Sequence, residues 1–286
     1  MIDLRALQPW LERESHATDC VAAPLAARMA ALLDQPEQGW SDGDAIPASW
    51  YVMLFGPTQP QSTLGADGHP PKGGLLPPVP WPRRMFAGRR VGFEGALRIG
   101  DRVTRHSRVT AITAKQGRSG PLCLVTLRHT LHTARGLAVT EEQDVVYRPA
   151  PPPGGAACAP SAAPHAAPPR EAAGTRTLVP DNTLLFRYSA VAYNAHRIHY
   201  DEAYAREVEG YPGLVVNGGL STLLLWRLAE HACGTALRRS ATRNLRPLFA
   251  GRPLTLNVGQ VQGGQAAAWV LDDQGAVAIE AELELA

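Results

Sequence analysis

Two imidazoles, a carboxamide, a guanidinium, two phenols and a carboxylate fall within nine residues of this sequence, YNAHRIHYD at positions 193–201. An imidazole exchanges protons near neutral pH, so the two histidines could provide acid–base catalysis. Placing so many polar groups on a globular core costs free energy unless they are partnered, and functional sites are where that cost is usually tolerated. We therefore expect the chemistry of the chain to lie here.

An apolar helix is expected to follow this polar segment. It opens with Asn217-Gly218-Gly219 and then leaves little polar surface, as burial requires, with Leu220, Leu223, Leu224, Leu225, Trp226, Leu228, Ala229 and Ala232. A strand-like stretch precedes the polar segment at 184–193, and further strands are expected at 240–246, 254–262, 266–272 and 276–285. The second half of the chain is thus predicted to be one central helix with an antiparallel sheet.

The first half of the chain has the same outline. A stretch of good helix formers at 18–33 precedes a long loop, rich in Gly and Pro, that extends to about residue 83. Residues that favour strands then concentrate at 89–97, 102–115, 122–133 and 137–147. The predicted fold class is α+β, with two antiparallel sheets each wrapped round a central helix.

Residues 149–174 separate the two halves and are almost entirely Pro, Ala and Gly. Such a segment has nothing large to bury, and each proline removes a backbone donor, so we predict a partly extended linker. The predicted domains are residues 1–148 and residues 175–286, both of ordinary domain size.

The composition argues against several classes of protein. With 45% hydrophobic and 19% charged residues among 286, the chain is typical of globular proteins. The first thirty residues lack the apolar core of a secretory signal, and no stretch approaches the ~18 apolar residues of a membrane helix. We expect a cytoplasmic protein with no membrane partner. A net charge of +2 gives no general reason to expect nucleic acid, and the scattered cysteines predict no metal site.

Several segments together resemble one family. The stretch 187–219, with YNAHRIHYD and the later PGLVVNG at 212–218, resembles the C-terminal half of the MaoC-like and hydratase 2 hot-dog proteins. The first half adds LGADGHP at 64–70, LPPVP at 76–80, RRM at 83–85 and GRSG at 117–120. These segments narrow the resemblance to the branch that holds mesaconyl-C4-CoA (3-methylfumaryl-CoA) hydratase and the mitochondrial-type 3-hydroxyacyl-thioester dehydratases.

The resemblance implies a double hot dog, in which two helix-and-sheet units share one continuous sheet. It also implies an enzyme that adds water to a 2-enoyl thioester or removes it. Coenzyme A would then be part of the substrate, and no separate cofactor is expected. The first domain would be a fatty-acid-synthase-like dehydratase half that binds the acyl tail, and the second would carry the catalytic motif. A homodimer is the family expectation.

The family motif is altered in this chain. Relatives commonly have an aspartate five residues before the motif histidine and an asparagine three before it, whereas here those positions hold Asn194 and His196, and the histidine is His199. We predict that His199 is the base that takes a proton from water and that Asn194 orients this water. The acid that protonates Cα is either the same imidazolium, acting through a water, or His196.

Glycines and basic residues complete the predicted site. The backbone N–H groups of Gly218 and Gly219, at the start of a helix, are expected to stabilise the thioester oxyanion. Substrate contacts are predicted for Tyr193, His196, Arg197, Asn217, Gly219, Arg246 and Arg84. Guanidinium groups suit the phosphates of coenzyme A. Arg83, Arg84, Arg118 and the Asp67-Gly68-His69 loop are candidates for a free acyl carboxylate. Arg197 could instead pair with Asp201.

Three classes of function follow from these residues. The leading one is hydration of a 2-enoyl-CoA, with mesaconyl-C4-CoA to citramalyl-CoA as the expected reaction and a 3-hydroxyacyl-thioester dehydratase of fatty acid metabolism as the alternative. A hot-dog acyl-CoA thioesterase is the second, although such enzymes typically use an Asp or Glu that the motif positions here lack. A non-catalytic acyl-CoA binder is the third.

Overall fold

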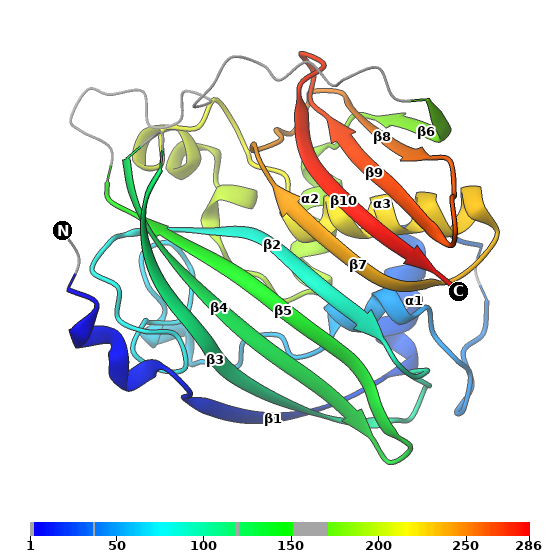
Figure 1. Cartoon of the computed structure of the whole chain (residues 1–286), viewed down its shortest axis with the longest axis horizontal. Helices are drawn as coiled ribbons and strands as arrows, with labels where there is room; N and C mark the ends of the chain where they lie inside the picture. The colour runs from blue at the N-terminus through cyan, green and yellow to red at the C-terminus, as the bar shows by residue number, and fades with distance from the viewer. Residues whose placement is uncertain (1–2, 37, 118–119, 151–170) are drawn as a thin grey trace.

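Ten strands form one antiparallel sheet that runs through both halves of the chain. In the computed structural model, the strand order is β1-β3-β4-β5-β2-β7-β10-β9-β8-β6. The structure describes residues 3–36, 38–117, 120–150 and 171–286. Figure 1 shows the strands crossing the molecule with the helices α1, α2 and α3 behind them. The continuous sheet is the one expected of a double hot dog.

The first half contributes five strands: β1 Glu14–Cys20, β2 Arg83–Phe93, β3 Arg102–Gly117, β4 Gly120–Thr133 and β5 Gly136–Arg148. In β4, every second residue from Cys123 to Leu131 is buried, which is the pattern of a strand with one face on the core. The strands expected at 102–115, 122–133 and 137–147 are confirmed. The predicted helix at 18–33 begins later, as α1 Ala23–Leu32, because residues 14–20 pair with β3 as an edge strand.

The second half contributes β6 Ala172–Leu178, β7 Leu237–Asn244, β8 Leu254–Gly259, β9 Gln265–Leu271 and β10 Val277–Leu285, with helices α2 Asn182–Val191 and α3 Gly218–Cys233. The strand predicted at 184–193 is wrong, since these residues form α2. Its N-cap is Asp181, whose carboxylate accepts a hydrogen bond from the Leu184 N–H at 2.7 Å. The expected apolar helix is confirmed as α3, which contacts β6, β7, β8 and β9.

Short helical turns cover the connections. They are η1 Arg5–Trp10, η2 Ala48–Met53, η3 Gln61–Thr63, η4 Arg197–His199 and the π-type turn η5 Tyr204–Val208. Helix α1 contacts α2 and η2. Within the described residues, each helix falls short of the length and apolar character needed to cross a lipid bilayer.

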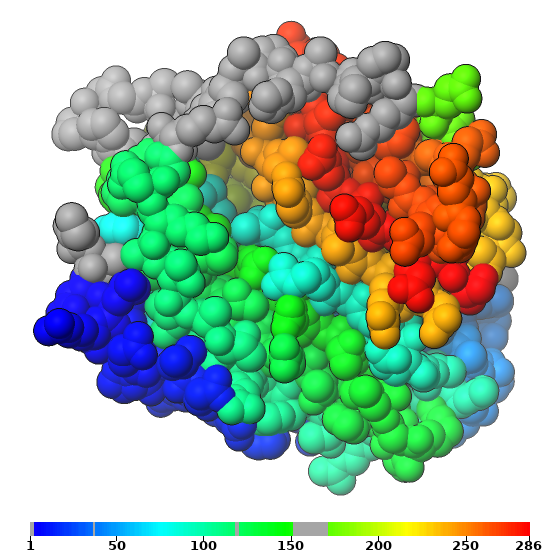
Figure 2. Space-filling view, viewed as in Figure 1, coloured from blue at the N-terminus to red at the C-terminus, as the bar shows by residue number. Residues whose placement is uncertain are grey.

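Strands β2 and β7 join the two halves. They pair antiparallel from Gly88 opposite Arg243 to Gly92 opposite Arg239. A Cβ on Gly88 would lie 2.2 Å from the Thr242 carbonyl oxygen, so this close approach requires glycine. In Figure 2, the atoms of β2 and β7 lie side by side near the middle of the visible face. The halves therefore share one sheet and one large hydrophobic cluster, and a second, smaller cluster lies within the first half.

The predicted linker at 149–174 falls mostly on residues 151–170, which lie outside the described residues. Its last three residues, 172–174, belong to β6 instead, where residues 172 and 174 pair with Gly259 and Val258 of β8. The domain boundaries at 148 and 175 stay predictions.

Candidate active site

A cleft of about 1950 Å³ is lined by residues from both halves of the chain. Typical small-molecule pockets measure roughly 300–1,000 Å³, so this cleft has room for a long ligand. Nine of the ten predicted site residues line it; the exception is Arg197. They are Asn194, His199, Gly218, Tyr193, His196, Asn217, Gly219, Arg246 and Arg84. The sequence motif and the cleft therefore coincide.

His199 ends η4 and is buried in the wall of the cleft. Its Nδ1 lies 2.7 Å from the Val215 carbonyl oxygen, which can only accept, so Nδ1 carries the proton and Nε2 keeps a lone pair. Burial lowers the pKa of His199 to about 4. The imidazole is thus neutral at pH 7 and has the tautomer that a general base needs at Nε2.

His196 and Asn194 precede His199 on the same turn. The His196 ring is buried, and its centroid lies 5.4 Å from that of His199. Burial, together with the neighbouring imidazoles, lowers the pKa of His196 to about 2, so it is uncharged at neutral pH. The Asn194 Oδ1 accepts a hydrogen bond from the His196 backbone N–H at 3.0 Å. The oxygen of Asn194 therefore shapes the turn, and its amide nitrogen remains for a ligand.

Arg197 forms the ion pair with Asp201 that was the alternative to a substrate contact. Its guanidinium donates to the Asp201 carboxylate at 2.7 Å and lies 4.2 Å from the centre of the Tyr204 ring. Its Nη1 also donates to the carbonyl of Ala66 at 3.0 Å. We assign Arg197 to holding loops together rather than to contacting substrate. Tyr193, in contrast, is 70% exposed at the cleft rim.

The start of α3 presents unpartnered polar groups to the cleft. The first N–H groups of a helix have no intrahelical acceptor, and the N-cap residue Asn217 makes no side-chain capping bond. The Asn217 Oδ1 is buried and accepts no hydrogen bond from the described residues. A Cβ on Gly219 would lie 2.3 Å from the Tyr188 hydroxyl, so only glycine fits. This arrangement suits a thioester oxygen that gains negative charge.

The loop at Asp67-Gly68-His69 lies beside the catalytic turn. It was predicted only as a candidate to bind a free acyl carboxylate, but it contacts a histidine of that turn. The His69 Nδ1 is 2.9 Å from the Asp67 Oδ2, and the His69 ring centroid is 4.1 Å from that of His196. His69 and His196 both line the cleft. The loop was a candidate from the sequence, but its contact with His196 was not predictable, because more than one hundred residues separate the two in the chain.

The basic residues of the cleft differ in how they are paired. Arg246 lies 3.4 Å from the Asp272 carboxylate, and Arg83 lies 3.6 Å from that of Glu209. Arg84 is half-buried and forms no ion pair with any residue that the structure describes. Its charge is close enough to influence Asp67 and His69. Arg118 lies outside the described residues.

A buried arginine supports the start of α3 and was not predicted. Arg89 of β2 donates to the Tyr51 hydroxyl at 3.1 Å and lies 3.4 Å from the Glu141 carboxylate. Its guanidinium also lies 4.7 Å from the centre of the Phe86 ring. Arg89 is 8% exposed, and it ties β2, β5 and η2 together while lining the cleft. Nothing in the alternating strand pattern distinguishes it from its exposed neighbour Arg90.

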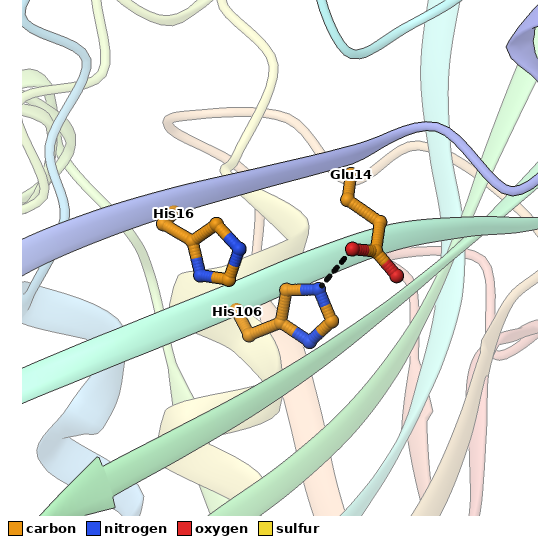
Figure 3. A group of neighbouring side chains, drawn as sticks. All are labelled: Glu14, His16 and His106. Atoms are coloured by element: carbon orange, nitrogen blue, oxygen red, sulfur yellow. Dashed lines mark ion pairs between the residues drawn. The ribbon is translucent and has the colours of Figure 1, made fainter.

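Two groups of histidine and carboxylate side chains have the spacing of possible cation ligands, one of Asp67, His69 and His196 and one of Glu14, His16 and His106. We assign neither as a metal site. In the cleft, Asp67 and His69 already bond each other, and the positive charge of Arg84 is nearby. The second group, drawn in Figure 3, lies on β1 and β3, and none of its three residues lines the cleft. Its Glu14 is 3.8 Å from Arg108.

Comparison with known proteins identifies the family of this chain. Residues 50–250 match the family model described as hydroxyacyl-thioester dehydratase type 2. The mesaconyl-C(4)-CoA hydratase of Chloroflexus aurantiacus is 42% identical over 276 residues, which cover 96% of each chain. The mitochondrial hydroxyacyl-thioester dehydratase type 2 of Schizosaccharomyces pombe is 36% identical over 84 residues, or 28% of each chain.

Solved structures show the same architecture at low sequence identity. A MaoC-like dehydratase from Phytophthora capsici has a TM-score of 0.70 at 15% identity and covers 100% of this chain and 99% of its own. A double-hotdog protein from Mycobacterium tuberculosis has a TM-score of 0.62 at 14% identity over 96% of each chain. The fold is thus a double hot dog, and the chain belongs to the hydroxyacyl-thioester dehydratase type 2 family and is a hydro-lyase.

Proposed function

We propose that this protein hydrates a short 2-enoyl-CoA with a free carboxylate, and that its reaction is the conversion of mesaconyl-C4-CoA to citramalyl-CoA. The observation that carries the substrate class is Arg84, a cationic group in the cleft without an ion-pair partner among the described residues. Mesaconyl-C4-CoA carries its free carboxylate on Cβ, which is the carbon that receives water. The relative with 42% identity, which has the name of this hydratase, supports the same choice.

The chemistry follows from the groups in the cleft. The His199 Nε2 takes a proton from water as the water oxygen bonds to Cβ, and the Asn194 amide helps to hold this water. The π electrons move toward the thioester oxygen, whose negative charge is stabilised by the N–H groups at Gly218 and Gly219. Protonation of Cα then gives the 3-hydroxyacyl thioester. Dehydration is the same sequence in reverse.

The rest of the cleft is proposed to bind the coenzyme A part of the substrate. Arg246 is proposed to contact coenzyme A phosphates, and Tyr193 and Asn217 to contact the thioester arm. Coenzyme A is part of the substrate, so we propose no separate cofactor or metal. We also propose a cytoplasmic homodimer without nucleic-acid or membrane partners. Sedimentation of the purified protein tests the dimer, since a monomer at all concentrations would contradict it.

The substrate is tested by a panel of mesaconyl-C4-CoA, crotonyl-CoA and a long-chain enoyl-CoA. We expect loss of enoyl absorbance to be fastest with mesaconyl-C4-CoA, and mass spectrometry to identify citramalyl-CoA. A preference for the long chain would instead favour a fatty-acid dehydratase. Release of free coenzyme A, detected with a thiol reagent, would favour a thioesterase.

Arg84→Met should raise the KM for mesaconyl-C4-CoA and leave the KM for crotonyl-CoA unchanged, because crotonyl-CoA has no second carboxylate. Loss of a charge-assisted hydrogen bond worth ~1.5–3 kcal/mol predicts a roughly tenfold to hundredfold change in kcat/KM. Arg90→Met, on an exposed part of β2, is the control. Equal effects of Arg84→Met on both substrates would contradict the assignment.

A further inference from the structure

The altered motif leaves the site without the carboxylate that relatives carry next to the catalytic histidine, and the structure supplies one from the other half of the chain. Asp67 is the acidic residue in hydrogen-bond contact with the cleft histidines among the described residues, through His69 at 2.9 Å. Both side chains are about one quarter exposed, at 26% for Asp67 and 23% for His69. His69 is therefore reachable from the cleft that it lines.

We propose that Asp67 and His69 form the second acid–base group of this active site: His69 exchanges the proton at Cα, and His199 exchanges the proton of water. This proposal rests on the proposed hydration of an enoyl thioester. It assigns His69 as a catalytic residue and Asp67 as its positioning residue.

The charges in the cluster favour His69 as the proton carrier. Three imidazoles follow one another, with centroid distances of 4.1 Å from His69 to His196 and 5.4 Å from His196 to His199. His199 is bonded to a neutral backbone carbonyl, whereas His69 is bonded to a carboxylate, which favours the imidazolium form. A single proton shared by the cluster is therefore best held on His69.

Other groups around His69 act in opposite directions. Burial, followed by the positive charge of Arg84, holds the pKa of His69 below its ordinary value, although the Asp67 carboxylate raises it. For Asp67, burial alone would raise the pKa, but the hydrogen bonds from His69 and the charge of Arg84 hold it below its ordinary value. A substrate carboxylate bound at Arg84 would offset that positive charge. Binding of the proposed substrate class would thus favour protonation of His69.

The loop that carries the pair is fixed against the catalytic turn. The Arg197 N–H donates to the Asp67 carbonyl at 3.0 Å, and the Gly65 N–H donates to the His69 carbonyl at 2.8 Å. Gly68 has φ +83°, and a Cβ there would lie 1.9 Å from the Ala195 carbonyl oxygen. Only glycine allows this approach. The pair is therefore held in place by backbone contacts, as a proton-transfer group requires.

The proton balance of hydration closes with these two histidines. The O–H bond of water breaks, its oxygen bonds to Cβ, and its proton passes to the His199 Nε2. The electron pair of the double bond forms an enolate, which takes a proton at Cα from the His69 imidazolium. Neutral His69 keeps its Nδ1–H on Asp67. Transfer of one proton from His199 to His69, through His196 or solvent, restores the starting state.

The test compares His69→Gln, Asp67→Asn and His16→Ala in the full-length protein. The Gln amide can still donate to Asp67 but cannot exchange a proton, so we expect kcat to fall by about 100-fold or more with KM within about threefold of the parent. Asp67→Asn should lower kcat less and move the alkaline limb of the pH–rate profile to lower pH, because His69 loses the carboxylate that raises its pKa. His16→Ala removes an exposed histidine of the group in Figure 3, away from the cleft lining, and should leave the rate unchanged.

Chemical rescue separates proton transfer from a structural role. Added imidazole should restore part of the activity of His69→Ala, because the His69 side chain is 23% exposed, and none to His199→Ala at equal concentration, because His199 is 7% exposed. His69→Gln within about threefold of the parent kcat would overturn this proposal while leaving the proposed function standing. Inactivity of the parent toward the whole enoyl-CoA panel would overturn both. Loss of activity in chelator that zinc restores would also overturn it.

Discussion

Asn194 stands where relatives of the broad family carry an aspartate, and its oxygen accepts the backbone N–H of His196. An aspartate would accept the same hydrogen bond. Asn194→Asp should therefore keep the turn and add a negative charge beside two neutral imidazoles. That charge raises the pKa of both histidines, so the acid limb of kcat/KM should move to higher pH. A pH–rate profile measures this, and an unchanged limb would contradict the expected coupling.

His199 is the residue on which the reaction depends most directly. His199→Ala removes the Nε2 base while the Val215 N–H still donates to the Ile198 carbonyl at 2.9 Å and holds the strand-like segment in place. We expect hydration to fall by a factor of roughly 100 to 10,000 with the far-ultraviolet circular dichroism unchanged. Activity within about tenfold of the parent would show that another group takes the proton from water.

The sequence predicted the residues of the catalytic turn because they are neighbours along the chain. His196, His199 and the glycines of α3 could be read as one motif, and all of them line the cleft. The contact between His69 and His196 could not be predicted in this way, since it depends on how one loop of the first half lies on the second. For Arg197 the sequence left two roles open, a substrate contact or an ion pair with Asp201. The structure has the ion pair.

At the scale of elements, the position of the first N–H groups of α3 depends on the absence of a side chain at Gly219 as well as on the helix dipole. Gly219→Ala would place a Cβ 2.3 Å from the hydroxyl of Tyr188, a ring that is buried and cannot turn away freely. Overpacking of this kind costs about 1–3 kcal/mol. We expect a lower melting temperature and at least a tenfold loss of kcat from displaced N–H groups. A melting temperature and a kcat equal to those of the parent would show that the start of α3 or the Tyr188 ring can shift at little cost.

Strand β2 carries two adjacent arginines with opposite surroundings. Arg89→Met leaves the Glu141 carboxylate buried without its cation, which should cost roughly 3–5 kcal/mol of unfolding free energy. Arg90 is exposed and pairs with Glu142 and Asp144, so Arg90→Met should cost about 1 kcal/mol or less. Urea unfolding of both variants measures the difference. Equal losses would contradict the buried network around Arg89.

Elements whose hydrophobic residues repeat with the period of a strand or a helix were predictable from the sequence, and the other elements were not. Strands β3, β4 and β5 and helix α3 are long, and their burial follows the expected pattern. Strand β1 has only exposed and half-buried residues, so no core pattern marks it. Helix α2 was mistaken for a strand although Asp181 offered an N-cap signal. Pairing with the distant strand β3 decided the structure of β1, whereas α2 begins at a local cap.

At the scale of the whole molecule, buried histidines make stability depend on pH. His199 has a folded-state pKa of about 4, below the ~6.5 of an unfolded chain. The unfolded state therefore binds more protons below pH 6.5, and stability is lost as the pH falls toward 4. Between pH 7 and pH 5, this one residue should contribute a loss of about 2 kcal/mol.

Thermal unfolding of the parent and of His199→Gln at pH 7 and pH 5 tests this value. The variant should lose less stability on acidification than the parent by about 2 kcal/mol. His16→Ala, which removes an exposed histidine, should behave like the parent. Identical acid sensitivity of parent and His199→Gln would show that His199 is not held neutral by burial.

The pairing of β2 with β7 also bears on how such proteins can diverge. Hydrogen bonds between strand backbones do not depend on which side chains the strands carry, apart from positions such as Gly88 where another strand comes too close. Two lineages can therefore replace most of their side chains and still keep the same spatial relation between the halves. Only the residues that face the cleft then have to change together, and new substrates can be reached by changing them alone.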